Sequence, residues 1–389
     1  MAWPERERLK VLQLVKTSVG ATWALRQIRE LVKLGVEVHV ALPPGGPLVP
    51  RYEAEGARVH TVQLDFPAKT PWRLPRVSKE MRNLVSSIRP DIIHSHFVGT
   101  TLTARLGLGR NHPVPRVFQV PGPLHLEHAF FREAELLTAG RSDYWVASSE
   151  WTRKRYLASG ISQNRLFLSY YGVDLDGYRG QRKGKLRELL RVDSSTILVG
   201  MVAYMYPPKR YLGQTRGLKG HEDLIDAMSW VVKKHPNARC VFIGGAWNNA
   251  FLYEERVRAY GKKKLGEHAL FLGTRDDVSE LYPDFDVAVH PSHSENVGGA
   301  VESLLHGVPT VATNVGGLPD LVRHGKTGWL TSPRDPKKLA EAISATLQNP
   351  THSRQMALQG EILARQMFDV TTTARQVLDI YHTVTSHGR

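Results

Sequence analysis

Two glutamates and a pair of glycines stand close together in the second half of the chain and could bind a charged ligand. Glu295 lies in a polar loop, Gly298 and Gly299 follow it, and Glu302 comes about one helical turn later. A glycine pair before a helix lets the backbone approach a ligand, and free N–H groups at a helix start favour a phosphate. The two carboxylates could grip sugar hydroxyls or face a developing cation. Taken singly, Glu302 could also be a solvated helix residue and Glu295 an ordinary loop residue.

A short βαβ unit is expected to position these side chains. Residues 286–290 (DVAVH) predict a buried strand, residues 300–306 a helix, and residues 308–313 (VPTVAT) the next strand. Gly307 ends the helix between them. Strands joined through a helix in this way run parallel. The pattern therefore predicts an anion site at the carboxyl end of the first strand.

The stretch 294–328 carries the pattern SEN-GG-E-GVP-VAT-VGG-PD-V-G-TG, which resembles the signature of the family 4 glycosyltransferases. The resemblance implies the GT-B architecture, an α/β fold in which two Rossmann-like domains face each other across a cleft. In the family the two glutamates stand one residue further apart than here, where six residues separate Glu295 from Glu302. Ser294 falls where the first is expected, so Glu295 is predicted to substitute for it after a one-residue deletion.

The resemblance also implies roles for this stretch. Glu295 is expected to steady the transferred sugar as a catalytic residue, and Glu302 to accept hydrogen bonds from the ribose of a nucleotide donor. Four neighbouring residues are further donor-binding candidates: Asn296, Val297, Gly298 and Gly299.

The family places two cations beside the donor diphosphate, an arginine after the first strand of the second domain and a lysine before a glycine. Here the strand 196–203 is followed by Tyr204 at the arginine position, and a long loop leads to Lys219. Lys219 keeps the family position and is predicted to be catalytic, since cations offset the charge that grows on the leaving group. We expect Arg216 to replace the missing arginine. Lys209 and Arg210 are the alternatives.

Three further candidates come from loops after predicted strands. Thr274 and Arg275 lie in the loop that holds the nucleotide base in the family. Gly20 lies in the first strand-to-helix turn, which approaches the donor phosphates or the acceptor in the family; a tight turn alone is the ordinary interpretation.

A histidine after the strand 114–120 is expected near the reacting centre of the sugar. Pro121 holds the position that the family gives to this histidine, and His125 is the nearest one. We predict His125 as a catalytic residue, with an ordinary loop histidine as the alternative. Upstream, alternation along a strand puts His94 and His96 on one face. A metal site there would need a third ligand, so strand-end polarity is the preferred interpretation.

Composition supports two ordinary packed domains. The chain has 389 residues, 41% of them hydrophobic, and we predict domains at 1–178 (acceptor side) and 192–369 (nucleotide-sugar donor), with a final helix 370–389 crossing back onto the first. The single cysteine, Cys240, excludes a disulfide framework and favours a reducing compartment. The N-terminus lacks the layout of a signal peptide, and no stretch approaches the roughly 20 apolar residues of a membrane span. We expect a cytoplasmic protein.

A net charge of +15 favours anionic partners, and the basic clusters include 153–155, 182–185 and 262–264. They could be solvated faces or could contact the inner face of a membrane; no nucleic-acid motif accompanies them.

The resemblance implies a retaining hexosyltransferase that uses a nucleotide-diphosphate sugar, with UDP as the expected nucleotide. The acceptor is expected to be a glycan, as in polysaccharide biosynthesis, a lipid-linked intermediate or a small molecule. No cofactor and no metal are expected, because side chains and helix dipoles supply the positive charge. A GT-B sugar-nucleotide epimerase or phosphorylase remains an alternative. So does a non-catalytic basic module that binds membrane or nucleic acid.

Overall fold

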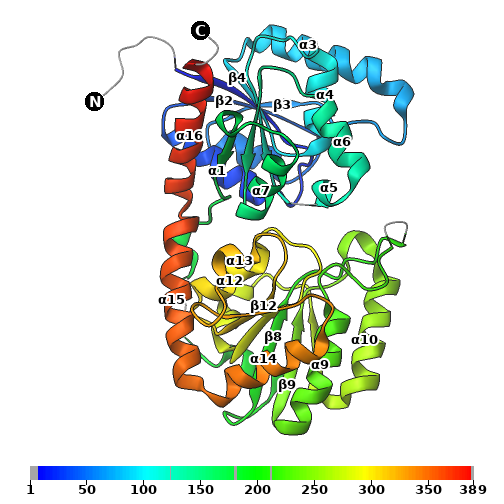
Figure 1. Ribbon diagram of the computed structural model, residues 1–389, viewed down its shortest axis with the longest axis vertical. Helices are drawn as coiled ribbons and strands as arrows, with labels where there is room; N and C mark the ends of the chain where they lie inside the picture. Colours follow the sequence, from blue (N-terminus) through cyan, green and yellow to red (C-terminus); the bar gives the residue numbers. More distant parts are fainter. Residues whose placement is uncertain (1–7, 123, 179–181, 211–212, 387–389) are drawn as a thin grey trace. The chain divides into compact units, whose positions relative to one another are not determined.

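The computed structural model describes residues 8–122, 124–178, 182–210 and 213–386, which form two compact units (Figure 1). The N-terminal unit comprises Met1–Asp174 and Met367–Arg389, and the C-terminal unit comprises Leu175–Gln366. The chain thus divides four residues before the predicted end of the first domain. Residues 1–7 and 387–389 of the predicted domains lie outside the described residues, as do residues 211–212 of the long loop before Lys219.

The N-terminal unit is built on a seven-stranded parallel sheet in the order β3-β2-β1-β4-β5-β6-β7. Strands such as VFQV carry near-continuous apolar runs because helices cover both faces of the sheet. The strands are β1 (Lys10–Leu14), β2 (Glu37–Leu42), β3 (Arg58–Thr61), β4 (Ile92–Ser95), β5 (Arg116–Val120), β6 (Asp143–Ala147) and β7 (Leu166–Leu168).

The helices of this unit include the last helix of the chain. They are α1 (Thr22–Lys33), α2 (Val49–Ala54), α3 (Leu74–Ile88), α4 (Val98–Leu108), α5 (Leu124–Glu127), α6 (Ala129–Leu137), α7 (Glu150–Ala158) and α16 (Val370–Ser386). Helix α16 lies along α1 (Figure 1), and its apolar face enters the same core. Ile28 of α1 and Val377, Tyr381 and Val384 of α16 are all fully buried there.

The C-terminal unit holds a six-stranded parallel sheet in the order β10-β9-β8-β11-β12-β13. Its strands are β8 (Ile197–Val202), β9 (Ala238–Ile243), β10 (Ala269–Gly273), β11 (Val287–His290), β12 (Thr310–Thr313) and β13 (Trp329–Thr331). From β8 the chain moves outward to β9 and β10, and it then returns to β11 on the other side of β8. Ligands of such sheets bind outside the carboxyl ends of the strands at this reversal.

The helices of the C-terminal unit cover both faces of its sheet (Figure 1). They are α8 (Lys185–Leu190), α9 (His221–Lys234), α10 (Phe251–Leu265), α11 (Val278–Leu281), α12 (Gly298–Leu305), α13 (Leu318–Leu321), α14 (Pro336–Gln348) and α15 (Pro350–Phe368). The sequence analysis gave no prediction for α10 or α15.

Candidate active site in the C-terminal unit

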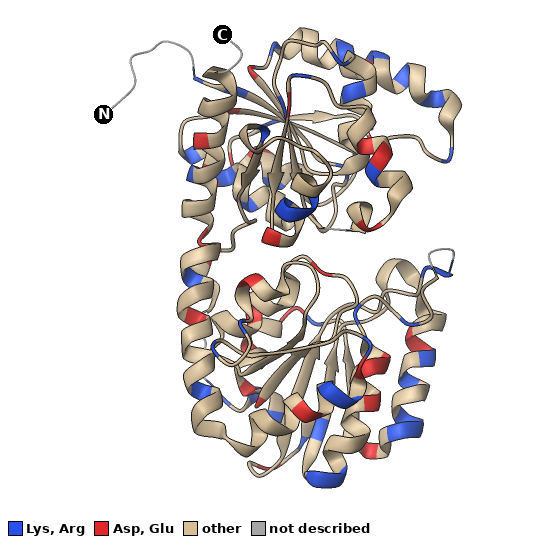
Figure 2. Cartoon of the chain, viewed as in Figure 1, with Lys and Arg blue, Asp and Glu red and all other residues tan. Residues whose placement is uncertain are grey.

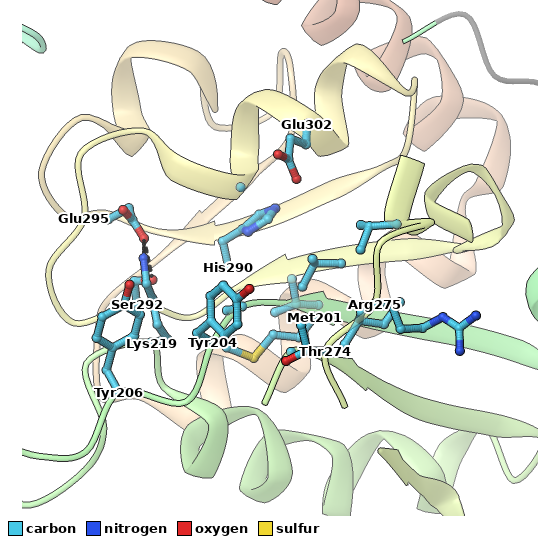
Figure 3. Close-up of a pocket in the computed structure, with 17 residues that line it drawn as sticks. Met201, Tyr204, Tyr206, Lys219, Thr274, Arg275, His290, Ser292, Glu295 and Glu302 are labelled. Atoms are coloured by element: carbon cyan, nitrogen blue, oxygen red, sulfur yellow. Dashed lines mark hydrogen bonds and ion pairs between the residues drawn. The ribbon is translucent and has the colours of Figure 1, made fainter. Parts of the chain in front are cut away.

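A pocket of about 330 Å3 opens where β8 and β11 end, at the start of α12; we call it the α12 pocket (Figure 3). Every residue that lines it belongs to the C-terminal unit. Six of the residues predicted from the sequence line it: Lys219, Thr274, Arg275, Glu295, Gly299 and Glu302. The full lining of the pocket comes from five separate segments of the chain, which the topology brings together.

The start of α12 explains the glycine pair. Gly298 has a φ of +37°, and a Cβ atom there would lie 2.8 Å from Cδ of Glu295. A Cβ atom on Gly299 would lie 3.1 Å from Cε1 of His290. Both glycines therefore allow close packing against a residue of the pocket, and α12 begins two residues earlier than the sequence predicted. Its free N–H groups are available for an anion because a helix start leaves them without helical partners.

Glu295 and Lys219 form an ion pair inside the pocket. The Lys219 ammonium donates to Oε2 of Glu295, and both side chains are largely buried. Ser292 Oγ also donates to this carboxylate at 3.3 Å, and the Asn296 N–H donates at 3.2 Å. Burial alone would raise the pKa of Glu295, but Lys219 reverses this and holds the pKa below its ordinary value. Glu295 is therefore ionised in the folded protein.

Asn296 and Val297 lie beside the pocket without lining it. The Asn296 carbonyl accepts a hydrogen bond from the N–H of Gly317 at 2.8 Å. This bond joins the loop to the glycine pair Gly316–Gly317. Val297 is buried and immediately precedes α12. Both residues shape the loop that carries Glu295.

Glu302 reaches the same pocket from α12, on the side of His290 (Figure 3). Thr274 and Arg275 line the pocket on the side away from Glu295 and Lys219 (Figure 3). The Arg275 guanidinium is held by both carboxylate oxygens of Asp277, at 2.7 and 2.9 Å. The pocket therefore has a Lys219–Glu295 end and a Thr274–Arg275 end, and Glu302 lines it from helix α12.

The structure does not bring Arg216 into the lining of the α12 pocket. Its guanidinium donates to Asp223 at 2.9 Å and to Asp226 at 2.7 Å, and Arg216 does not line the α12 pocket. These two carboxylates on α9 hold the side chain in place. Its partners lie on α9, and the sequence alone could not place that helix relative to the loop before Lys219.

Two predicted residues lie in the N-terminal unit. His125 is on α5, where Nε2 is 3.2 Å from the Tyr156 hydroxyl, and burial lowers the pKa of its imidazole. Gly20 has a φ of +77° in the turn before α1, and a Cβ atom there would meet nothing within 4 Å. The turn therefore needs glycine for its backbone conformation. The roles of both residues remain predictions.

Sequence reasoning missed several pocket residues. Tyr204 was noted only as a departure from the family pattern, and Tyr206, His290 and Ser292 were not chosen. His290 ends strand β11 and Ser292 lies two residues beyond it, so both could have been found from their position at the carboxyl end of the strand. Burial lowers the pKa of His290 to about 4, so its imidazole is neutral near pH 7.

The His94–His96 pair lies on one strand face, as predicted. The two rings stack with centroids 4.3 Å apart and are fully buried. Their partners are Tyr381, Gln13 and Tyr171. Among the residues that the structure describes, no group of three or more histidine, cysteine, aspartate or glutamate side chains could hold a metal ion.

Lysine and arginine are spread over helices of both units and interleave with aspartate and glutamate (Figure 2). Within the predicted basic clusters, Arg153 pairs with Glu150, Arg182 with Asp286, and Lys264 approaches Asp226. These pairs favour the solvated-face interpretation for part of the charge. None of the described helices is long and apolar enough to cross a membrane.

Two Rossmann-like domains, each with one parallel sheet, define the GT-B class of enzyme. The model of the family "Glycosyltransferase Family 4" matches residues 20–176, and that of "Glycosyl transferases group 1" matches residues 210–361. The chain belongs to the family 4 glycosyltransferases.

Two similar proteins of known sequence are named as sugar transferases. The chain is 28% identical to the sulfoquinovosyl transferase SQD2 of Arabidopsis thaliana, over 84% of this chain and 62% of that protein. It is 24% identical to the D-inositol 3-phosphate glycosyltransferase of Thermobispora bispora, over 91% of this chain and 87% of that protein. The chain thus spans somewhat less than two thirds of the first of these relatives.

Solved structures share the fold. The structure of Anabaena Alr3699/HepE in complex with UDP matches with a TM-score of 0.80 at 22% identity, over 97% of this chain and all of that one. Sucrose-phosphate synthase from Thermosynechococcus elongatus matches with a TM-score of 0.79 at 19% identity, over 98% of this chain and all of that one. Both likenesses extend over both units.

Proposed function

We propose that the protein is a retaining glycosyltransferase that moves a hexose or N-acetylhexosamine from a UDP-linked sugar to an acceptor hydroxyl. The observation that carries the proposal is the α12 pocket, which combines a buried lysine, a helix start and two carboxylates. A lysine and free N–H groups bind phosphate, and carboxylates accept hydrogen bonds from sugar hydroxyls. A nucleotide-diphosphate sugar presents both kinds of group.

The two ends of the pocket suit the two ends of such a donor. The diphosphate would lie between Lys219 and the N–H groups of α12, and the ribose hydroxyls would donate to Glu302. The base would lie at the Thr274–Arg275 end. Support for UDP comes from Anabaena HepE, whose structures are described in complex with UDP and with UDP-glucose.

Binding requires Lys219 to exchange partners. Its ammonium now pairs with Glu295, which the sequence assigns to the transferred sugar. An incoming diphosphate would draw Lys219 to itself, and the Glu295 carboxylate would then be available to sugar hydroxyls. One ion pair thus couples occupation of the phosphate position to orientation of the sugar.

In the proposed reaction the bond between the anomeric carbon and the leaving phosphate oxygen breaks as the sugar gains oxocarbenium character. The acceptor hydroxyl attacks from the same face and forms the new glycosidic bond. Its proton passes to the departing phosphate oxygen, so no covalent enzyme intermediate is needed. Lys219 and α12 stabilise the charge that grows on the diphosphate. We propose that this positive charge makes a metal ion unnecessary.

The acceptor is proposed in class only: a glycan, a lipid-linked intermediate or a small molecule. The relatives are named for transferring sulfoquinovose and for acting on D-inositol 3-phosphate, which differ widely. We assign the acceptor side to the N-terminal unit, with His125 near the reacting centre. A cytoplasmic location with peripheral contact at the inner membrane face would fit the basic surface.

The test is a panel of UDP-, GDP- and ADP-sugars with sugar, lipid-linked and cyclitol acceptors, followed by NMR of the product. The account expects a UDP-sugar to be consumed, the new bond to keep the donor's anomeric configuration, and activity to survive a chelator. An inverted product would refute retention. Loss of activity in the chelator, restored by a divalent cation, would refute the proposed metal independence. Donor turnover that yields only an epimer or a sugar phosphate would favour the related non-transferase chemistry.

A further inference from the structure

Two aromatic side chains line the α12 pocket, one of them beside Lys219, and a third that does not line it contacts both. Tyr204 and Tyr206 line the pocket from the loop after β8. Trp247, from the loop after β9, stacks on Tyr206 with ring centroids 4.9 Å apart and planes 26° from parallel. The ring centroids of Trp247 and Tyr204 lie 5.5 Å apart. We call Tyr204, Tyr206 and Trp247 the aromatic wall.

The aromatic wall is fixed in place by its backbone. The Met205 N–H donates to the carbonyl of Gly245 at 2.8 Å, and the Trp247 N–H donates to the carbonyl of Met205 at 3.2 Å. These bonds join the loops after β8 and β9 and hold together the backbone that carries the three rings. Met205 itself is fully buried.

The aromatic wall is built into the polar site. The Lys219 ammonium lies 5.7 Å from the ring centroid of Tyr206, a favourable distance for a cation over an aromatic face. Burial, followed by the charge of Glu295, raises the pKa of Tyr206 to about 12, so its hydroxyl stays neutral. Tyr206 therefore helps to hold the Lys219–Glu295 pair.

Part of the wall nevertheless remains exposed. The Tyr204 side chain is 42% exposed and that of Trp247 is 37% exposed, although both residues belong to a packed domain. Aromatic surface left open beside a pocket is a place where a ligand can bury apolar area. The position of Tyr204 is also where the family carries a phosphate-binding arginine, so this chain has a ring in place of a charge.

Of the three parts of a nucleotide-sugar, the sugar fits this surface best. The base is assigned to the Thr274–Arg275 end, which lies away from Tyr206 in the pocket (Figure 3). A diphosphate is disfavoured because the faces of aromatic rings carry partial negative charge. A pyranose ring presents an apolar face of C–H groups and a rim of hydroxyls. The aromatic rings can pack against the C–H face, and the Glu295 carboxylate can accept hydrogen bonds from the hydroxyls at the rim.

We infer that the aromatic wall is a sugar subsite that stacks on the C–H face of the donor's pyranose ring and contributes to the choice of sugar. The inference rests on the proposed donor function. It predicts that the protein distinguishes UDP-glucose from UDP through Tyr204 and Trp247. Loss of these rings therefore weakens binding of the sugar and leaves binding of the nucleotide intact.

The test measures the affinities of UDP and of UDP-glucose for the full chain by calorimetry. Tyr204→Ala and Trp247→Ala are each expected to weaken UDP-glucose about three- to tenfold, the range of one aromatic contact. UDP affinity is expected to stay within about twofold, on the same grounds. Tyr204→Phe keeps the ring and is expected to keep the preference for UDP-glucose. Phe251→Ala, which removes an exposed ring outside the pocket, is the matched control.

The outcomes separate the two proposals. If wild type binds neither ligand, the donor function fails and the sugar subsite fails with it. If wild type binds both but Tyr204→Ala weakens them equally, the wall serves the nucleotide and only the inference is overturned. No change in either affinity would show a purely structural wall and would also overturn it. Because Tyr204 is partly exposed, its variant serves even if Trp247→Ala fails to fold.

Discussion

Two clusters of polar side chains occupy equivalent places in the two units. In the N-terminal unit, His94 lies on β4, which pairs with the first strand β1, and His96 follows immediately after β4 ends. In the C-terminal unit, His290 ends β11, which pairs with the first strand β8. Both clusters therefore lie at the carboxyl ends of strands where the chain reverses direction across the sheet. Their contents differ in charge and in exposure.

The N-terminal cluster is closed and neutral. Gln13 donates through Nε2 to the Tyr381 hydroxyl at 2.9 Å and accepts from His96 at 2.8 Å. The Tyr381 hydroxyl lies 2.5 Å from Nδ1 of His94. Burial lowers the pKa of both imidazoles, which therefore stay uncharged. This network joins α16 to the sheet.

The C-terminal cluster is open and charged. Lys219 and Glu295 pair with each other across a pocket of about 330 Å3, and Glu302 lines the same space. A charged pair beside open space can exchange partners with a ligand, whereas a buried neutral network can only lose its hydrogen bonds. The comparison shows that the place of a residue at the end of a strand indicates where polar side chains gather. Their burial then decides whether they can bind a ligand or only stabilise the fold.

The largest expected effect is on Lys219. Lys219→Ala should lower the rate of sugar transfer roughly 10²- to 10³-fold, the usual cost of removing one group that stabilises a leaving charge. Steady-state kinetics with a saturating UDP-sugar measures it. Lys234→Ala, an exposed lysine on α9, is the control and should retain full activity. Equal rates for both variants would show that the pocket lysine plays no part in the chemistry.

The closed network predicts the opposite pattern for Tyr381. Tyr381→Phe leaves Nε2 of Gln13 and Nδ1 of His94 without their buried hydroxyl partner and should lower the free energy of unfolding by about 1–3 kcal/mol. Binding of UDP to the folded variant should stay unchanged. Urea unfolding with wild type and Arg375→Gln, an exposed residue of α16, provides the comparison. A variant as stable as wild type would mean that the network does not brace α16.

Acid should weaken the N-terminal unit through the same network. The pKa of His96 is about 3 in the folded chain, against an ordinary value of 6.5, so between these values only the unfolded chain binds the proton. Stability is complete above pH 6.5 and falls as the pH drops toward about 3. The loss by about pH 5 is roughly 2 kcal/mol for this one group. Thermal unfolding against pH should show a steeper acid slope for wild type than for His96→Gln.

The smallest effect is expected at Arg216. Arg216→Ala removes two partly exposed ion pairs on α9 and should cost about 1 kcal/mol or less in stability. Donor affinity should be the same as in wild type, because the guanidinium lies outside the pocket. Calorimetry decides the point. A tenfold loss of UDP affinity would return Arg216 to the phosphate site and would contradict the structure.

Much of the site could be predicted because its residues follow one another along the chain. Glu295, Gly299 and Glu302 belong to a single βαβ unit, so local periodicity fixed their order in space. Arg216 could not be placed in this way, because its partners Asp223 and Asp226 depend on how α9 turns toward the loop.

Parts of the fold were missed for a related reason. Helix α10 buries a narrow column of residues at every fourth position, and one member of that column is Gly261. A Cβ atom on Gly261 would lie 2.8 Å from the ring of Phe271 on β10. Close packing against this strand therefore favours glycine at a position where a helical pattern would have an apolar side chain. Trp247 was missed as well, because its contact with Tyr206 joins two loops that are distant in sequence.

The central claim is that the α12 pocket binds a nucleoside diphosphate. Lys219 and the start of α12 bind the diphosphate, and Glu302 binds the ribose. The most direct test is a calorimetric titration of UDP into wild type and Glu302→Ala, at equal ionic strength. The account predicts that wild type binds UDP and that the variant binds at least about fivefold more weakly, because a charge-assisted hydrogen bond to ribose is lost. Equal affinity in the two proteins, or no binding to wild type, would contradict it.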